Sequence, residues 1–126
     1  MNYKIVRSQD ARRSETPNAV MTTLASPTVS GAVDTSLWLV EMKAGASGPI
    51  HAMDSDQHWH VLRGALQCEI DGVNNDLQAG DTITITAETT RQFRAVTDVV
   101  MVVTGKSNAA ASTEPGVAPV VPPWIS

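Results

Sequence analysis

The stretch that decides the fold runs from Gly48 to Gly72 and reads GPIHAMDSDQHWHVLRGALQCEIDG. Its second half alternates like a β-strand, breaks at Gly64, and alternates again until Asp71-Gly72, a pair typical of a hairpin turn. The same stretch contains all three histidines of the chain and its only cysteine. It therefore predicts paired strands that carry most of the groups able to bind a metal or move a proton.

Alternation divides the strand expected over residues 57–62 into two faces, because successive side chains point to opposite sides of a sheet. One face carries Gln57, Trp59 and Val61, and the other carries His58, His60 and Leu62. In the next strand Cys68 alternates with Leu66 and Ile70, which is typical of a small core residue. His58 and His60 therefore share one face of the strand over residues 57–62, opposite Gln57 and Trp59.

Further short β-rich segments surround this stretch. We expect strands over residues 4–7, 18–24, 36–42, 81–86, 91–95 and 99–104, with the last buried on both faces. We expect residues 8–18 to form a polar connection, residues 74–76 to extend a turn, and residues 106–126 to form a Pro-rich tail. No segment has the periodicity of an amphipathic helix. The pattern predicts an all-β sandwich or barrel.

Composition excludes several classes of protein. The chain has 126 residues, enough for one domain, and a net charge of −4, which argues against a nucleic-acid surface. Its apolar runs are too short to span a membrane, and the N-terminus lacks the apolar region of a signal peptide. A single cysteine forms no internal disulfide. We therefore expect a cytoplasmic protein with neither a nucleic-acid nor a membrane partner.

Two segments resemble the motifs of the cupin family. The first cupin motif, G-x5-H-x-H-x3,4-E-x6-G, can be laid from Gly45 through His51, Met53 and Gln57 to Gly64. The second, G-x5-P-x-G-x2-H-x3-N, can be laid from Gly80 through Thr86, Glu88 and Arg91 to Ala95. The sequence pattern from Trp59 to Gly72 and the run AGDTITI over residues 79–85 also agree with the cupin motifs.

The resemblance implies a double-stranded β-helix, or jelly-roll barrel, within a single domain over residues 1–126. We expect its core at about residues 35–105, with N-terminal strands from residues 1–34 packed on it. Residues 106–126 are expected to form the tail. Its Trp124 either docks, over a barrel mouth or a partner subunit, or belongs to a loosely ordered end, and we favour docking. We also expect a homodimer.

The metal positions of the family are only partly kept. In metal-binding cupins two His and one Glu of the first motif join one His of the second. Here His51 is kept, whereas Met53, Gln57 and Arg91 occupy the other three positions. Met is a soft ligand, Gln is a weak one, and Arg is a permanent cation. The resemblance therefore implies a degenerate metal site with no cofactor.

The same four positions predict a pocket for a small organic molecule inside the barrel. His51 is the expected proton carrier, Arg91 the anchor for an anionic group, and Gln57 a hydrogen-bonding residue that orients the ligand. The expected pocket walls are Met53, Trp59, Phe93 and Trp38. A buried Arg91 needs an anionic partner, which is either the ligand or a carboxylate such as Asp54 or Asp56.

His58 and His60 can share a metal because they lie two residues apart on one strand face. In the cupin frame they point away from the interior, so we favour an outer-sheet or dimer-interface pair. A bulge or register slip between residues 54 and 60 would turn His58 or His60 inward. A divalent transition metal could then be bound by His51, Gln57 and that histidine.

These observations leave three functions open. The first is a metal-independent acid/base enzyme of isomerase, cyclase or lyase type that acts on a small anionic or polar organic substrate. The second is a ligand-binding or sensing protein without turnover. The third is a metal-dependent dioxygenase that uses His51 with a non-standard ligand set. A cupin barrel serves enzymes and binding proteins alike, so the fold does not choose among them.

Overall fold

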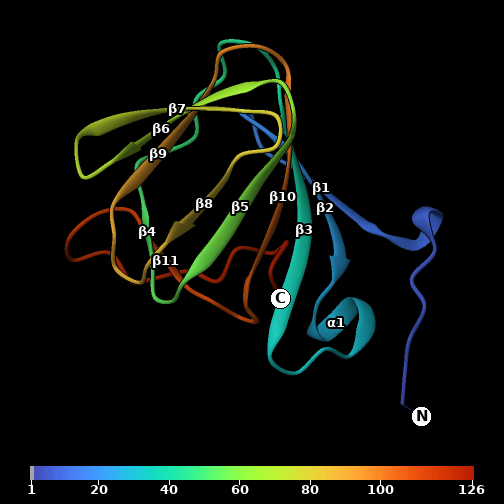
Figure 1. Ribbon diagram of the computed structural model, residues 1–126. Coiled ribbons are helices and arrows are strands. Elements are labelled where there is room, and N and C mark those ends of the chain that lie inside the picture. The colour runs from blue at the N-terminus through green and yellow to red at the C-terminus, as the bar shows by residue number, and fades with distance from the viewer. Residues whose placement is uncertain (1) are drawn as a thin grey trace.

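A computed structural model describes residues 2–126 as two antiparallel β-sheets that face each other (Figure 1). The larger sheet has the order β1 (Arg12–Glu15), β2 (Val20–Ala25), β3 (Thr35–Met42), β10 (Val99–Lys106), β5 (Gln57–Arg63) and β8 (Thr82–Ile85). The smaller sheet has the order β7 (Val73–Gln78), β6 (Ala65–Ile70) and β9 (Arg91–Ala95). This arrangement confirms the expected all-β jelly-roll barrel.

Short elements complete the chain. The strands β4 (Ala52–Met53) and β11 (Ala111–Ser112) pair with each other, and the helical turns are η1 (Ser8–Asp10) and α1 (Pro27–Ser30). The Ser26 side chain accepts a hydrogen bond from Val29 N at the start of α1, and Gly31 ends it with a φ of 74°. Within residues 2–126, no helix is long and apolar enough to cross a membrane.

The hydrophobic core lies between the two sheets and follows the predicted alternation. In β3 the inward residues Trp38, Val40 and Met42 are buried, and in β5 so are Gln57, Trp59 and Val61. The central strand β10 pairs with both β3 and β5. It buries one face fully, whereas Val100 and Val102 on the other stay partly exposed. The prediction that this strand is buried on both faces is therefore wrong.

Two strands, β1 and β7, were not predicted from the sequence. β7 is the partner of β6 across the hairpin at Asp71 and Gly72, whose φ angles are 46° and 83°. Two consecutive positive φ angles are typical of the tight turn whose twist matches that of the flanking strands. The second strand of the hairpin therefore begins directly after the turn and includes the polar residues 74–76. β1 pairs with β2 at the edge of the large sheet. Both strands are largely exposed, so they needed no apolar pattern; conversely, the strand expected at residues 4–7 is absent.

Gly64 sets the distance between the end of β5 and the start of β10. Its φ is +88°, and a Cβ atom there would lie 2.1 Å from the carbonyl oxygen of Asp98 and 2.9 Å from Cα of Val99. Both contacts are with backbone atoms, which cannot swing aside as a long side chain can. Only glycine fits this position without moving β10.

We predict that Gly64→Ala lowers the free energy of unfolding by at least about 3 kcal/mol, because it combines left-handed strain with a backbone clash. The matched control is Gly72→Ala, which has a φ of +83° but no atom within 4 Å of the new Cβ. It should cost only about 1 kcal/mol. Urea unfolding monitored by tryptophan fluorescence measures both changes, and equal losses would contradict the clash.

Candidate functional site

A cavity of about 470 Å³ lies inside the barrel. Inward side chains of β2, β3, β5 and β9 line it together with the segment 48–53 and the tail. Most of its wall is apolar, including Met21, Trp38, Val40, Met42, Met53, Trp59, Phe93, Val117, Trp124 and Ile125. Its polar lining includes His51 and Gln57. Six of the seven residues expected at the pocket thus line this cavity, and the seventh, Arg91, does not.

His51 is held in one orientation by its own backbone. Its N–H donates to Arg91 O at 3.0 Å and its carbonyl accepts from Arg91 N at 2.8 Å, which fixes the segment 48–53 against β9. In the side chain, Nδ1 lies 3.0 Å from the carbonyl oxygen of Pro49. A carbonyl can only accept, so Nδ1 carries the proton and Nε2 of the neutral ring is free to act as a base.

Electrostatics favour the neutral form of His51. Burial lowers the pKa of its imidazole, the hydrogen bond to Pro49 opposes this effect, and the positive charge of Arg91 lowers the pKa further. The ring is therefore neutral at pH 7, with an unprotonated nitrogen available for a proton from a bound molecule.

Gln57 is the acceptor for two buried donors. Its Oε1 receives the indole N–H of Trp59 at 3.1 Å and Nη1 of Arg91 at 3.2 Å. Two donors at one oxygen assign the orientation of the amide, because the opposite orientation would set the NH₂ group against both of them. The Nε2 amide group of Gln57 therefore remains available to donate a hydrogen bond to another acceptor.

Arg91 is 1% exposed and has no carboxylate partner. Its Nε and Nη2 donate to the carbonyl oxygen of Thr89 at 3.2 and 3.1 Å, and Nη1 donates to Gln57. The ion pairs found among residues 2–126 are Arg13–Glu15 and Lys43–Asp98. Arg91 therefore does not line the cavity itself but donates to Gln57, which does. Burial lowers the pKa of the Arg91 guanidinium.

Asp54 and Asp56 were alternative partners for Arg91, and this expectation is wrong. Asp54 Oδ1 accepts the N–H of Ala110 at 3.1 Å, and Asp56 Oδ1 accepts that of Ala87 at 2.9 Å. Both carboxylates are exposed and hold loops at the barrel end. The charge of Arg91 is thus balanced by carbonyl and amide oxygens alone.

Trp59 and Phe93 form an aromatic part of the cavity wall. Trp59 and Phe93 stack with ring centroids 4.0 Å apart and an angle of 27° between the planes. Trp38 is buried, and its indole N–H has no acceptor among residues 2–126. Cys68 is fully buried behind this wall, and burial raises the pKa of its thiol to about 12, against the opposing charge of Arg91. A thiol in that state is a core residue, as predicted, and not a nucleophile.

His58 and His60 point outward, as the alternation predicted. Their Nδ1 atoms lie 2.8 Å and 2.6 Å from Oγ1 of Thr84 and Thr82 in β8. β5 pairs with β8 in unbroken register from Gln57 to His60, so no bulge turns either histidine inward. The alternative metal set of His51, Gln57 and a shifted His58 or His60 is therefore not assembled.

The family's metal positions do not fit a divalent transition metal in this chain. His51 Nε2 is one good donor, but Gln57 Oε1 is already committed to two N–H groups, and Arg91 brings a positive charge to the fourth position. Met53 supplies only a soft thioether. Within residues 2–126, no group of three or more His, Cys, Asp or Glu side chains can hold a metal.

The tail is ordered against the barrel and closes one side of the cavity. Thr23 Oγ1 donates to the carbonyl oxygen of Trp124 at 2.7 Å, and Ser36 Oγ donates to that of Ile125 at 2.6 Å. Ile125 is 1% exposed. Docking of Trp124 is therefore confirmed. The sequence did not name Ile125, Met21, Val40 or Met42 as wall residues, although the inward alternation of β2 and β3 was a signal for the last three.

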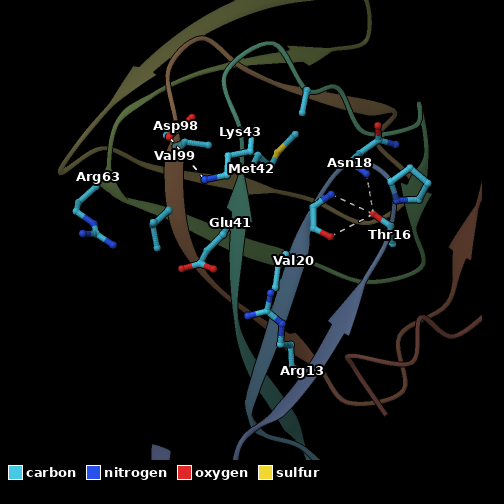
Figure 2. Close-up of a pocket in the computed structure, with 14 residues that line it drawn as sticks. Arg13, Thr16, Asn18, Val20, Glu41, Met42, Lys43, Arg63, Asp98 and Val99 are labelled. Atoms are coloured by element: carbon cyan, nitrogen blue, oxygen red, sulfur yellow. Dashed lines mark hydrogen bonds and ion pairs between the residues drawn. The ribbon is translucent and has the colours of Figure 1, made fainter.

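A second hollow of about 600 Å³ opens at the surface and is lined from β1, β2, β3, β5 and β10 (Figure 2). Figure 2 shows Glu41 between the arginines at positions 13 and 63, in keeping with the strand order. Lys43 Nζ lies 3.9 Å from Asp98 Oδ2 across an exposed edge. The hollow carries both signs of charge and no buried polar group aimed at a ligand, so it is a weaker candidate than the interior cavity.

Two facing antiparallel sheets around a mostly apolar cavity define a jelly-roll barrel built to enclose a small molecule. A family model described as "Cupin domain" matches residues 38–105, more than half of the chain. The protein therefore belongs to the cupin family. No curated protein matches it significantly.

Several solved structures share the fold. KdgF from Halomonas sp. is 20% identical, with a TM-score of 0.71 over 82% of this chain and 92% of that one. The polyketide cyclase RemF from Streptomyces resistomycificus is also 20% identical, with a TM-score of 0.69 over 82% and 78% of the two chains. Salicylate 1,2-dioxygenase from Pseudoaminobacter salicylatoxidans, with gentisate, is 15% identical, with a TM-score of 0.71 over 82% and 31%.

We predict that His51 makes the protein less stable in mild acid. Its pKa in the folded state lies below the ordinary value of 6.5, so the unfolded chain binds more protons as the pH falls through 6.5. The contribution of neutral His51 to the free energy of unfolding is complete above pH 6.5 and is lost as the pH falls through the pKa of His51 in the folded state. His51→Gln should flatten the change in the free energy of unfolding between pH 7.5 and about pH 5. Parallel curves for both proteins in urea titrations would contradict this.

We predict that the tail contributes to stability through Ile125. Ile125→Ala should lower the free energy of unfolding by about 2–4 kcal/mol, because it leaves a void at a buried site that also walls the cavity. The matched control, Val121→Ala, changes a residue that is 38% exposed in the same tail and should stay within about 0.5 kcal/mol of the parent. Similar unfolding midpoints for the two variants would mean that the tail is not anchored by Ile125.

Proposed function

We propose that this cupin is a metal-independent acid/base enzyme that removes or transfers a proton on a small organic molecule within the barrel. The observation that carries the proposal is the state of His51: a neutral imidazole, fixed through Nδ1–H to Pro49 O, on the wall of a mostly apolar cavity. A general base is most effective when its unprotonated form predominates at the working pH and water does not compete for it.

Gln57 supplies the electrophilic half of the reaction. When a base removes a proton next to a carbonyl or similar group, negative charge develops on the neighbouring oxygen or nitrogen. The Nε2 amide of Gln57 is the donor that would meet this charge. Arg91 Nη1 holds the opposite end of the same amide at 3.2 Å, so the cation polarises the donor and fixes its direction.

Arg91 acts in this scheme as a positioning residue and not as a direct anchor for the substrate. Its charge lies one hydrogen bond from the cavity, in surroundings of low polarity where an electrostatic effect is strong. It therefore favours a transition state that carries negative charge without forming a tight ion pair with the ground state. This difference between transition state and ground state is what accelerates a reaction.

The wall indicates a substrate with a flat, apolar body. The Trp59–Phe93 stack offers aromatic faces, and Trp38 and Met53 complete that part of the surface. Two structural neighbours are consistent with such a substrate: one is named as a polyketide cyclase, and the other is described with gentisate. Isomerisation, cyclisation and elimination all begin with the proton transfer proposed here. Homodimer formation and a cytoplasmic location stay predictions.

The proposal can be tested with 5-nitrobenzisoxazole, a flat bicyclic compound with one acidic C–H bond. A base takes this proton while the ring N–O bond breaks, giving a nitrile and a coloured phenolate. We expect the parent protein to accelerate this opening by about 10²-fold or more over buffer, and His51→Gln to lose that acceleration. Absorbance of the phenolate under saturating substrate gives kcat and KM.

Two further variants separate catalysis from binding. Arg91→Gln should lower kcat about tenfold with little change in KM, because it weakens a donor used in the transition state. Phe93→Leu should chiefly raise KM, because it removes the stacking surface. Circular dichroism confirms that each variant is folded. If the compound quenches tryptophan fluorescence and turns over no faster than in buffer, the protein is a binding module and the proposal is wrong.

A further inference from the structure

His58 and His60 stand on the outward face of β5, which the proposed enzyme activity does not use. A strand rises about 3.3–3.4 Å per residue, so their Cα atoms are about 6.7 Å apart and their side chains leave the same face. Imidazole nitrogen suits zinc, nickel and copper ions. Two imidazoles at this spacing can approach one ion from two directions.

Each ring is supported by a threonine of the edge strand β8, which lies beside β5 (Figure 1). The register sets His58 opposite Thr84 and His60 opposite Thr82. The Nδ1 to Oγ1 distances are 2.8 Å and 2.6 Å. A hydroxyl can accept as well as donate, so both Nδ1–H groups can be satisfied while both Nε2 atoms stay free.

This is the arrangement that prepares histidine as a metal ligand. In metal sites the ring nitrogen that does not bind the ion usually donates to an outer partner, which fixes the tautomer and the ring orientation. Here the outer partners are already in place on both rings. Fixing two side chains beforehand also reduces the conformational entropy lost on binding.

We propose that His58 and His60 form a surface chelate for a divalent late transition metal, with Cu²⁺ bound more tightly than Ni²⁺ or Zn²⁺. Across residues 2–126, no third His, Cys, Asp or Glu joins the pair, so water completes the coordination. A square-planar ion accepts such a set of two imidazoles and two waters. The site lies on the opposite face of β5 from Gln57 and Trp59, and it is independent of the proposed catalytic function.

The test is titration of tag-free protein with CuSO₄, followed by calorimetry and by electron paramagnetic resonance. We expect one Cu²⁺ per chain and a spectrum with coupling to two imidazole nitrogens. His58→Ala and His60→Ala should each lower the affinity at least about tenfold and leave one coupled nitrogen. Thr82→Val and Thr84→Val should each weaken binding by about tenfold, because the rings lose their outer support.

His51→Ala is the matched control, because it removes the remaining histidine of the chain, inside the cavity, and should leave copper binding unchanged. Urea unfolding checks that each variant is folded; the side chain at position 58 is exposed and that at position 60 is half-buried. Binding at parent affinity after His58→Ala and His60→Ala, or loss of binding after His51→Ala, overturns the proposal.

Discussion

The hydrogen bond from Arg91 Nη1 to Gln57 Oε1 joins the two sheets inside the barrel, because Arg91 belongs to β9 and Gln57 to β5. The same oxygen receives the indole of Trp59, and Trp59 stacks on Phe93 of β9. Two residues from each sheet thus form one buried network. Its members fix one another's rotamers, and His51 pairs with the backbone of Arg91, so the position of the candidate base depends on the same network.

The network carries a cost that packing alone does not explain. A buried guanidinium with only neutral oxygen partners loses more hydration than those partners return. A hydrophobic side chain at position 91 would close the barrel at lower cost. Gly105 lies opposite this side chain, and a Cβ there would lie 3.0 Å from Cγ of Gln57, so a larger residue would require a shift of a few tenths of an ångström. Stability given up at one buried position is typical of functional sites, and it supports the view that this cation is kept for its field within the cavity.

The tail gives the cavity its remaining wall. The buried residues Thr23 and Ser36 donate their hydroxyl groups to the carbonyl oxygens of Trp124 and Ile125. A backbone carbonyl buried without such a donor would be costly, so both hydroxyls favour the docked tail. The side chains of Trp124 and Ile125 then line the cavity together with His51 and Gln57.

The sequence by itself determined the all-β class and the inward faces of β3 and β5, because alternation has a period of two and glycine or Asp-Gly marks the turns. The barrel and the separation of His51 from His58 and His60 came from the resemblance of two segments to the cupin motifs. β1 and β7 were missed because exposed strands carry no apolar pattern. Only the tertiary structure decided that Arg91 contacts Gln57 and not Asp54, Asp56 or the cavity itself, and that Ile125 closes the wall. Those contacts join residues far apart in the chain, and their partners are chosen by the geometry of facing sheets and by competition among hydrogen-bonding groups, which spacing along the sequence does not encode.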